Sequence, residues 1–162
     1  MIRRYDSGAA FLAENQAFLD TKPHISEFMA LDAPQIEKTD KINYAARCEK
    51  DGKTLLAMKV EPYHLQLFGD ADCAGELLDF LVRGGYEIRN YLSEKTLGDA
   101  AAREMEARFG IRYEEALAME FMEAREVTEP SSPEVEAARE DDLDEICACM
   151  EHFLIDCNAG EV

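Results

Sequence analysis

The sequence lacks the signals of several large classes of protein. No apolar run approaches the ~18–20 residues that a membrane-spanning helix needs. The N-terminus carries Asp6 and Glu14 and has no continuous apolar core, so it does not resemble a secretory signal peptide. Neither G-x-x-x-x-G-K-[ST] nor G-x-G-x-x-G occurs, and no Ser or Cys stands in a nucleophile-elbow motif. The lack of both a membrane-spanning run and a signal peptide predicts a cytoplasmic protein.

Basic residues are scarce. The chain has 17 Lys and Arg against 35 Asp and Glu, which gives a net charge of −18. Nucleic acids and anionic membranes would be repelled, so neither is an expected partner. Between Glu120 and Glu145 there are eleven acids, and the bases are only Arg125 and Arg139. This stretch is either a solvated acidic surface with a linker or an attraction site for a cationic partner such as an amine substrate.

Enough apolar residues are present for a packed core. The 162 residues are 47% hydrophobic and 32% charged, which fits one globular domain or slightly more. Ile2–Tyr5 is predicted as a strand, followed by a helix capped by Asp6 or Ser7. A second helix is predicted to begin at Pro23 with Thr21 as a cap. Its buried face should consist of Ile25, Phe28 and Met29.

The clearest local signal is a β-hairpin. Apolar and polar residues alternate from Ile42 to Cys48 and again from Thr54 to Val60. Asp51-Gly52 lies between them, and Gly accepts the positive φ of a tight turn. A third strand is predicted over Tyr63–Phe68.

Helices and strands alternate in the next part of the chain. An amphipathic helix is predicted from its apolar residues at i, i+3, i+4 and i+7, which are Ala74, Leu77, Leu78 and Leu81. Tyr86–Tyr91 is predicted as a strand and Glu94–Phe109 as a helix. Residues 111–127 are predicted as a strand because large apolar residues alternate there, although their composition favours a helix.

The pattern predicts an α/β (α+β) fold with two domains. Residues 1–127 form the first, and residues 128–133, which contain two prolines and two serines, form a linker. Residues 134–162 are predicted to begin a second, incomplete domain with a strand over Val135–Arg139 and a helix after it. We expect four apolar residues of that helix to be exposed or covered by the first domain: Leu143, Ile146, Met150 and Leu154.

Cysteine and histidine residues near the C-terminus could suggest a metal site. They are Cys147, Cys149, His152 and Cys157. On a helix, Cys147 and Cys149 lie about 200° apart and cannot share a metal. Cys147 and Cys157 also belong to the apolar face, where Cys acts as a small hydrophobic residue. We therefore expect no metal, and free thiols throughout.

Two other candidates lie in the first domain. His64 is a lone strand histidine, which is most often structural. The turn Gly69–Gly75 leads from a strand into a helix, where free backbone N–H groups attract phosphates. Asp70 and Asp72 already place negative charge there, so a self-capped helix is favoured over a diphosphate site.

The order strand, two helices, three-stranded meander, helix, strand, helix, strand resembles the GCN5-related N-acetyltransferase (GNAT) fold. The segment Val135–Ile146 is similar to the usual opening of such a domain, a short strand followed by acid-Asp-Leu-x-x-Ile on the first helix. The whole chain resembles bacterial tandem GNAT proteins, in which a degenerate N-terminal lobe precedes a catalytic lobe. The family's acetyl-CoA loop, [Gln/Arg]-x-x-Gly-x-[Gly/Ala], is not matched by Leu67–Gly75.

This resemblance implies transfer of an acetyl group from acetyl-CoA to a small-molecule or peptide amine. In the family the amine attacks the thioester, a strand N–H stabilises the oxyanion, and the diphosphate rests on a helix N-terminus. No catalytic or cofactor-binding residue can be carried onto this chain, and we expect the acetyl-CoA loop to lie beyond Val162. The alternative is a non-enzymatic acidic α/β interaction or regulatory module.

Overall fold

A computed structural model describes residues 1–119 and 137–156, and the chain divides into two compact units, Met1–Glu123 and Ala124–Val162. The strands of the first unit are β1 (Ile2–Arg4), β2 (Tyr44–Lys50), β3 (Lys53–Lys59), β4 (Leu65–Gly69) and β5 (Tyr91–Leu92). Its helices are α1 (Gly8–Leu19), α2 (Pro23–Asp32), α3 (Ala74–Arg83) and α4 (Lys95–Phe109), with short 3₁₀ turns η1 (Ala33–Gln35) and η2 (Ala71–Cys73).

The strands form one sheet in the order β1-β2-β3-β4-β5. β5 pairs in parallel with β4, and the other neighbouring strands are antiparallel. This mixed, mostly antiparallel sheet with helices confirms the predicted α/β (α+β) fold class. The predicted hairpin is also confirmed: Lys50 pairs with Lys53, and the turn residues Asp51 and Gly52 have φ of 50° and 78°.

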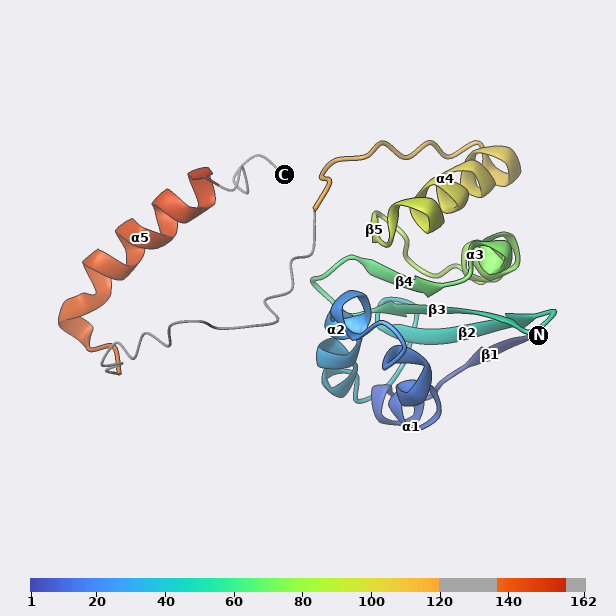
Figure 1. Cartoon of the computed structure of the whole chain (residues 1–162), viewed down its shortest axis with the longest axis horizontal. Coiled ribbons are helices and arrows are strands. Elements are labelled where there is room, and N and C mark those ends of the chain that lie inside the picture. The colour runs from blue at the N-terminus through green and yellow to red at the C-terminus, as the bar shows by residue number, and fades with distance from the viewer. Residues whose placement is uncertain (120–136, 157–162) are drawn as a thin grey trace. The chain divides into compact units, whose positions relative to one another are not determined.

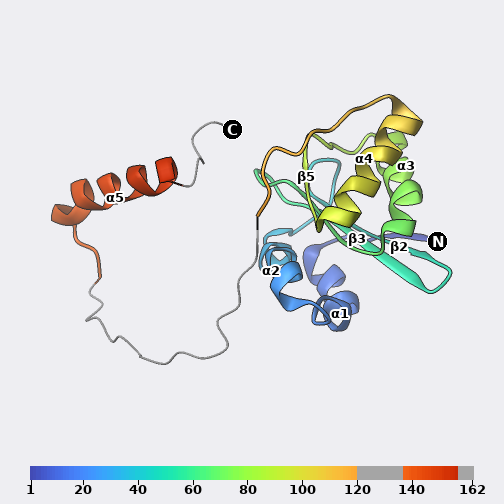
Figure 2. The same cartoon turned by 45° about the horizontal axis from the view of Figure 1, so that its top comes forward.

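Helices cover both faces of the sheet. Helices α1 and α2 lie on one face and α3 and α4 on the other, as both views show (Figures 1 and 2). The first face buries a cluster that includes Phe11, Leu19, Met29, Leu56 and Met58. The second face buries a cluster that includes Tyr44, Leu55, Leu65 and the predicted α3 residues Ala74, Leu77, Leu78 and Leu81.

The sequence predicted the cap of the first helix correctly and the cap of the second incorrectly. Ser7 caps α1, since its hydroxyl accepts a hydrogen bond from the Ala10 N–H at 3.2 Å. The prediction of Thr21 as the cap of α2 is wrong. Its hydroxyl donates to the Phe18 carbonyl, so it closes the end of α1. Phe28 is 45% exposed rather than buried.

Three predicted strands differ from the structure. β5 (Tyr91–Leu92) shares only Tyr91 with the strand predicted over Tyr86–Tyr91. Tyr86 instead lies in the core, where its ring packs edge-on against Tyr44. No strand forms over residues 111–119, and the rest of that prediction, residues 120–127, lies outside the described residues. Residues 137–139 also form no strand, and residues 128–136 are not described.

The second unit contains the 3₁₀ turn η3 (Glu140–Asp142) and helix α5 (Leu143–Asp156). The Asp142 carboxylate accepts a hydrogen bond from the Arg139 backbone N–H at 2.8 Å. Within this unit Leu143, Ile146 and Met150 are exposed, the side chain of Leu154 lies outside the described residues, and cover by the first domain stays a prediction. Among the described helices, none has both the length and the apolar character needed to cross a membrane.

Gly8 gives a direct test of how α1 packs. A Cβ atom at this position would lie 1.6 Å from the backbone carbonyl oxygen of Ala33, which cannot move aside without displacing η1. We expect Gly8→Ala to lower the free energy of unfolding by roughly 3 kcal/mol, although Ala normally favours a helix. Chemical denaturation monitored by circular dichroism measures the change.

The matched control is Gly98→Ala in α4. Its Cβ would lie 2.8 Å from the Ser93 hydroxyl, whose side chain can rotate away, and 3.7 Å from Tyr91 Cε2, which is an ordinary contact. This substitution should change stability by less than about 1 kcal/mol. Equal effects of the two substitutions would contradict the close approach of α1 to η1.

Candidate functional site

The turn between β4 and α3 is the best placed of the candidates for binding an anion, and its own side chains occupy it. β4 ends at Gly69, where φ is 130°. The Asp70 carboxylate then accepts a hydrogen bond from the Asp72 backbone N–H at 2.9 Å. A backbone donor that could have faced a ligand is therefore used within the turn, as the sequence predicted.

Two lysines from the β2–β3 hairpin reach this turn. Lys53 forms an ion pair with Asp72, and its ammonium lies 3.9 Å from the Asp70 carboxylate. Lys50 lies 2.5 Å from the carboxylate of Glu76 in the first turn of α3. These contacts hold the pKa of the Asp72 and Glu76 carboxyls below their usual values. The acids at the helix start are thus neutralised from within the chain.

The N-terminal turn of α3 is also covered from α4. The Arg108 guanidinium and the Glu104 carboxylate form an ion pair at 2.5 Å. A Cβ atom at Gly75 would lie 2.5 Å from Arg108 Nη2 and 2.6 Å from Glu104 Oε2. Glycine at this position lets the ion pair lie directly over the helix backbone. A diphosphate approaching there would have to displace it.

A cleft of about 660 Å³ runs beside this turn, between α3, α4 and the hairpin. Four basic and four acidic side chains line it: Lys50, Lys53, Arg103 and Arg108, with Asp51, Asp72, Glu76 and Glu104. The charges balance, and three of the four bases already form ion pairs with three of the acids. The cleft therefore has no net charge to attract a phosphate group.

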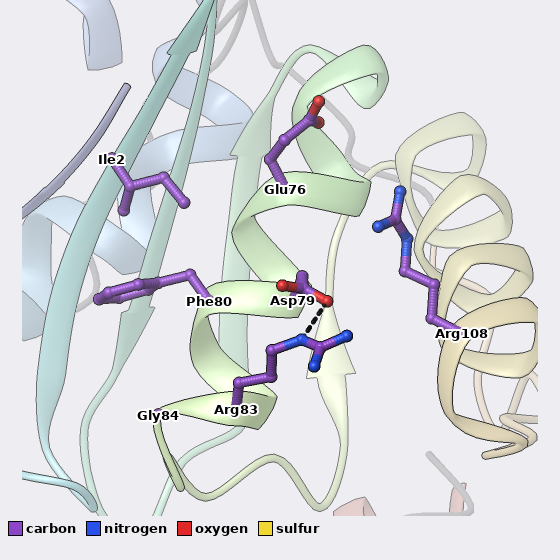
Figure 3. Close-up of a pocket in the computed structure, with 7 residues that line it drawn as sticks. All are labelled: Ile2, Glu76, Asp79, Phe80, Arg83, Gly84 and Arg108. Atoms are coloured by element: carbon purple, nitrogen blue, oxygen red, sulfur yellow. Dashed lines mark hydrogen bonds and ion pairs between the residues drawn. The ribbon is translucent and has the colours of Figure 1, made fainter.

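A second, more open groove of about 540 Å³ lies between β1 and the outer face of α3 (Figure 3). Ile2, Phe80 and Gly84 give it an apolar floor. Its charged residues are Glu76, Asp79, Arg83 and Arg108. Asp79 and Arg83 pair with each other at 2.7 Å, as the dashed line marks. The residues that line the groove include no nucleophile and no histidine, so none of them points to a catalytic reaction.

The other candidates from the sequence are not assembled into a site. His64 lies just before β4 rather than within it, and it is exposed. Cys147, Cys149 and His152 are exposed on α5, while Cys157 lies outside the described residues. Within residues 1–119 and 137–156, no group of three or more His, Cys, Asp or Glu side chains is placed to hold a metal ion.

Two buried cysteines were not singled out by the sequence. Cys48 on β2 and Cys73 at the end of η2 both lie in the core, where the Cys73 thiol donates a hydrogen bond to the Lys53 backbone carbonyl at 3.7 Å. Burial raises the pKa of both thiols, that of Cys73 to about 11. Because the thiolate is the reactive form, these groups are poor nucleophiles. The alternation of the strand predicts that Cys48 faces inward. That Cys73 would lie in the same core cluster could not be predicted from spacing.

Comparison with known proteins adds no relative to this description. No protein-family model, curated protein or solved structure matches the chain.

The cysteines give a direct test of this geometry. In a Cys157→Ser variant at pH 8, we expect Cys147 and Cys149 to react promptly with Ellman's reagent, because both are exposed. Cys48 and Cys73 should react only after unfolding, because burial keeps them protonated and covered. The two phases of thionitrobenzoate release measure this difference.

Two double variants assign the phases. Cys147→Ser with Cys149→Ser should remove the fast phase, and Cys48→Ser with Cys73→Ser should remove the slow phase. Prompt release of thionitrobenzoate from a folded variant that lacks Cys147, Cys149 and Cys157 would disprove burial of the core pair.

Proposed function

We propose that the chain is the N-terminal part of a cytoplasmic GNAT-family N-acetyltransferase, which transfers an acetyl group from acetyl-CoA to an amine. The observation that carries the proposal is the order of the elements. Strand β1, two helices, the β2–β3–β4 meander, α3, β5 and α4 follow one another in the order that the resemblance implies. A net charge of −18 also favours a cationic amine over an anionic substrate.

Within the described residues, that order is not completed after α4. Residues 111–119 form no strand, and Leu117 and Met119 are 63% and 52% exposed there. The second unit has the acid-rich start of a helix at Glu140–Asp142, followed by α5, and this supports the proposal of a second lobe. The first unit is therefore proposed to be a degenerate lobe.

The residues at the N-terminus of α3 do not fit the diphosphate of acetyl-CoA. Asp70 uses a backbone donor of the turn, and the ion pair of Glu104 with Arg108 lies over Gly75. A diphosphate would be repelled by the acids and blocked by the ion pair. We derive no catalytic step in this lobe, and we propose that the acetyl-CoA site belongs to the second one.

Titration with acetyl-CoA tests whether the turn between β4 and α3 can accept a diphosphate. We expect isothermal titration of this chain to show no binding tighter than about 1 mM. Micromolar affinity would contradict the proposed division between the lobes, because it would require an open phosphate site in the first.

A matched pair of variants tests the physical reason. Asp72→Asn with Glu76→Gln removes two acids at the turn and frees Lys53 and Lys50 from their ion pairs, so affinity for inorganic pyrophosphate should rise. Asp20→Asn with Glu27→Gln makes the same change of net charge at exposed positions far from the turn. If both variants gain equal affinity, the effect is due to net charge alone and the local explanation is wrong.

The experiment that tests the acetyltransferase itself is the sequence of the gene. If the second lobe exists, the reading frame should encode [Gln/Arg]-x-x-Gly-x-[Gly/Ala] about 60–90 residues after Val162, on ordinary strand and loop lengths. A stop codon directly after Val162 would contradict the proposal.

The second candidate function is an acidic interaction module without enzymatic activity. Helix α5 favours it, since this helix combines exposed apolar side chains with acids and contains no Lys or Arg. The gene sequence separates the two candidates, because only the acetyltransferase requires an acetyl-CoA loop.

A further inference from the structure

Strand β1 has an open edge, because among the described residues only β2 pairs with it. The Met1 carbonyl accepts a hydrogen bond from β2 at 2.8 Å, and the Tyr5 N–H donates one to β2 at 3.0 Å. Residues that bond to one neighbouring strand alternate along an antiparallel strand. The backbone N–H and C=O groups of Ile2 and Arg4 therefore point toward the open side, where they can bind a further strand.

The groove between β1 and α3 lies along this edge. Ile2 and Phe80 point into it from the two elements, and both residues are half-buried (Figure 3). Ile2 and Arg4 are two residues apart, so their side chains lie on the same face of the sheet as the groove. A strand added beside β1 would place every second side chain over that face. An open strand edge next to a helix is a geometry in which peptides bind by strand addition.

Beside the groove lie two cations that form no ion pair with an acid of residues 1–119 or 137–156. The Arg4 guanidinium donates to the Tyr86 hydroxyl at 3.4 Å. The Lys41 ammonium lies 3.8 Å from the centre of the Tyr86 ring and donates to the carbonyl of Gly84, which lines the groove. The arginines that line the groove are already paired with acids. This end of the groove therefore carries local positive charge in a chain of net charge −18.

We propose that the open edge of β1 binds an extended peptide as a further strand, with an apolar side chain beside Ile2 and an acidic side chain two residues away beside Arg4 and Lys41. The spacing of two residues follows from the alternation of side chains along both strands. A second copy of β1 does not have this chemistry, because it carries Arg3 and Arg4 and no acid. Arginines on a short edge also discourage unspecific strand pairing, so the charge selects an acidic peptide. The inference does not depend on the acetyltransferase, because the edge, the groove and the cations all belong to the first unit.

The probe is a fluorescein-labelled peptide of sequence Thr-Glu-Thr-Ile-Thr-Glu-Thr. An acid stands two residues from the isoleucine on either side, so one of them reaches Arg4 and Lys41 whichever way the peptide runs. Fluorescence anisotropy measures its binding to the whole chain at about 0.15 M salt, where charges more than about 8 Å away are screened. We expect a Kd of about 100 µM, which a few backbone hydrogen bonds and one apolar side chain can supply.

Three altered peptides separate the contributions. Replacing both glutamates by lysine reverses the charge, and replacing the isoleucine by serine removes the apolar side chain. Methylating the backbone nitrogens of the isoleucine and its two neighbours removes the donors that face β1 in either direction and keeps every side chain. We expect each change to weaken binding by about tenfold or more.

A matched pair of variants tests the two cations. Arg4→Gln with Lys41→Gln should weaken binding of the acidic peptide by about tenfold. Arg103→Gln with Arg112→Gln makes the same change of net charge at exposed positions that do not line the groove, and it should change the affinity by less than about twofold. Far-UV circular dichroism checks that both variants keep their secondary structure.

NMR spectra of the ¹⁵N-labelled chain locate the bound peptide. The amides of Ile2 and Arg4 should shift most, because their N–H groups point to the open side. The amide of Arg3 should shift less, because its N–H is already bonded to β2.

Four results would overturn the proposal. No binding of the acidic peptide to the whole chain would mean that the edge is blocked. Equal binding of the lysine peptide would mean that the cations do not select the ligand. Unchanged affinity after backbone methylation would mean that no strand is added, and largest NMR shifts outside β1 and the groove would place the peptide elsewhere on the chain.

Discussion

Strand β3 is buried on both of its faces, and both helical layers of the first unit pack against it. Leu55 and Ala57 point into the cluster covered by α3 and α4, while Leu56 and Met58 point into the cluster covered by α1 and α2. All four side chains are inaccessible to solvent. Because successive side chains of a strand alternate between faces, a shift of register by one residue would exchange the two sets. The Asp51-Gly52 turn that fixes this register therefore fixes both cores.

The same hairpin determines the chemistry of the β4–α3 turn. Its register places Lys50 and Lys53 on either side of the tight turn, next to the acids that begin η2 and α3. Packing of α4 along α3 then lays the ion pair of Glu104 and Arg108 over Gly75. Charges from three separate elements thus close a position at which a strand leads into a helix. Such positions favour phosphates when they are open.

Local patterns predicted the parts of this structure that depend on neighbours in sequence. Three features could be predicted in this way: the alternation around Asp51-Gly52, the i, i+3, i+4, i+7 spacing of α3, and Asp70 as a capping residue. The prediction of a strand over Tyr86–Tyr91 was wrong except at Tyr91, since Tyr86 packs edge-on against Tyr44, forty-two residues earlier, and not in the sheet. A contact between residues so far apart in the sequence produces no periodic pattern of residue types.

The closed turn was predicted only in part for the same reason. Asp70 and Asp72 were evident, but Lys50 and Glu76 are separated by 26 residues, and their contact depends on the sheet register. Over residues 111–119 the predicted strand shows the opposite error. Alternating residues satisfy the pattern of a strand, but residues 111–119 do not pair with the sheet. Alternation alone cannot supply the hydrogen-bonding partner that a strand requires.

Strand β3 holds the two cores of the first unit together, because both helical layers pack against it. Native-state hydrogen exchange measured by mass spectrometry tests this directly. Within residues 1–119, the amides of β3 and of its partners β2 and β4 should exchange slowest, at a rate set by global unfolding. Faster exchange of β3 than of the edge strand β1 would contradict this, because it would show that the sheet opens at its centre before its edge.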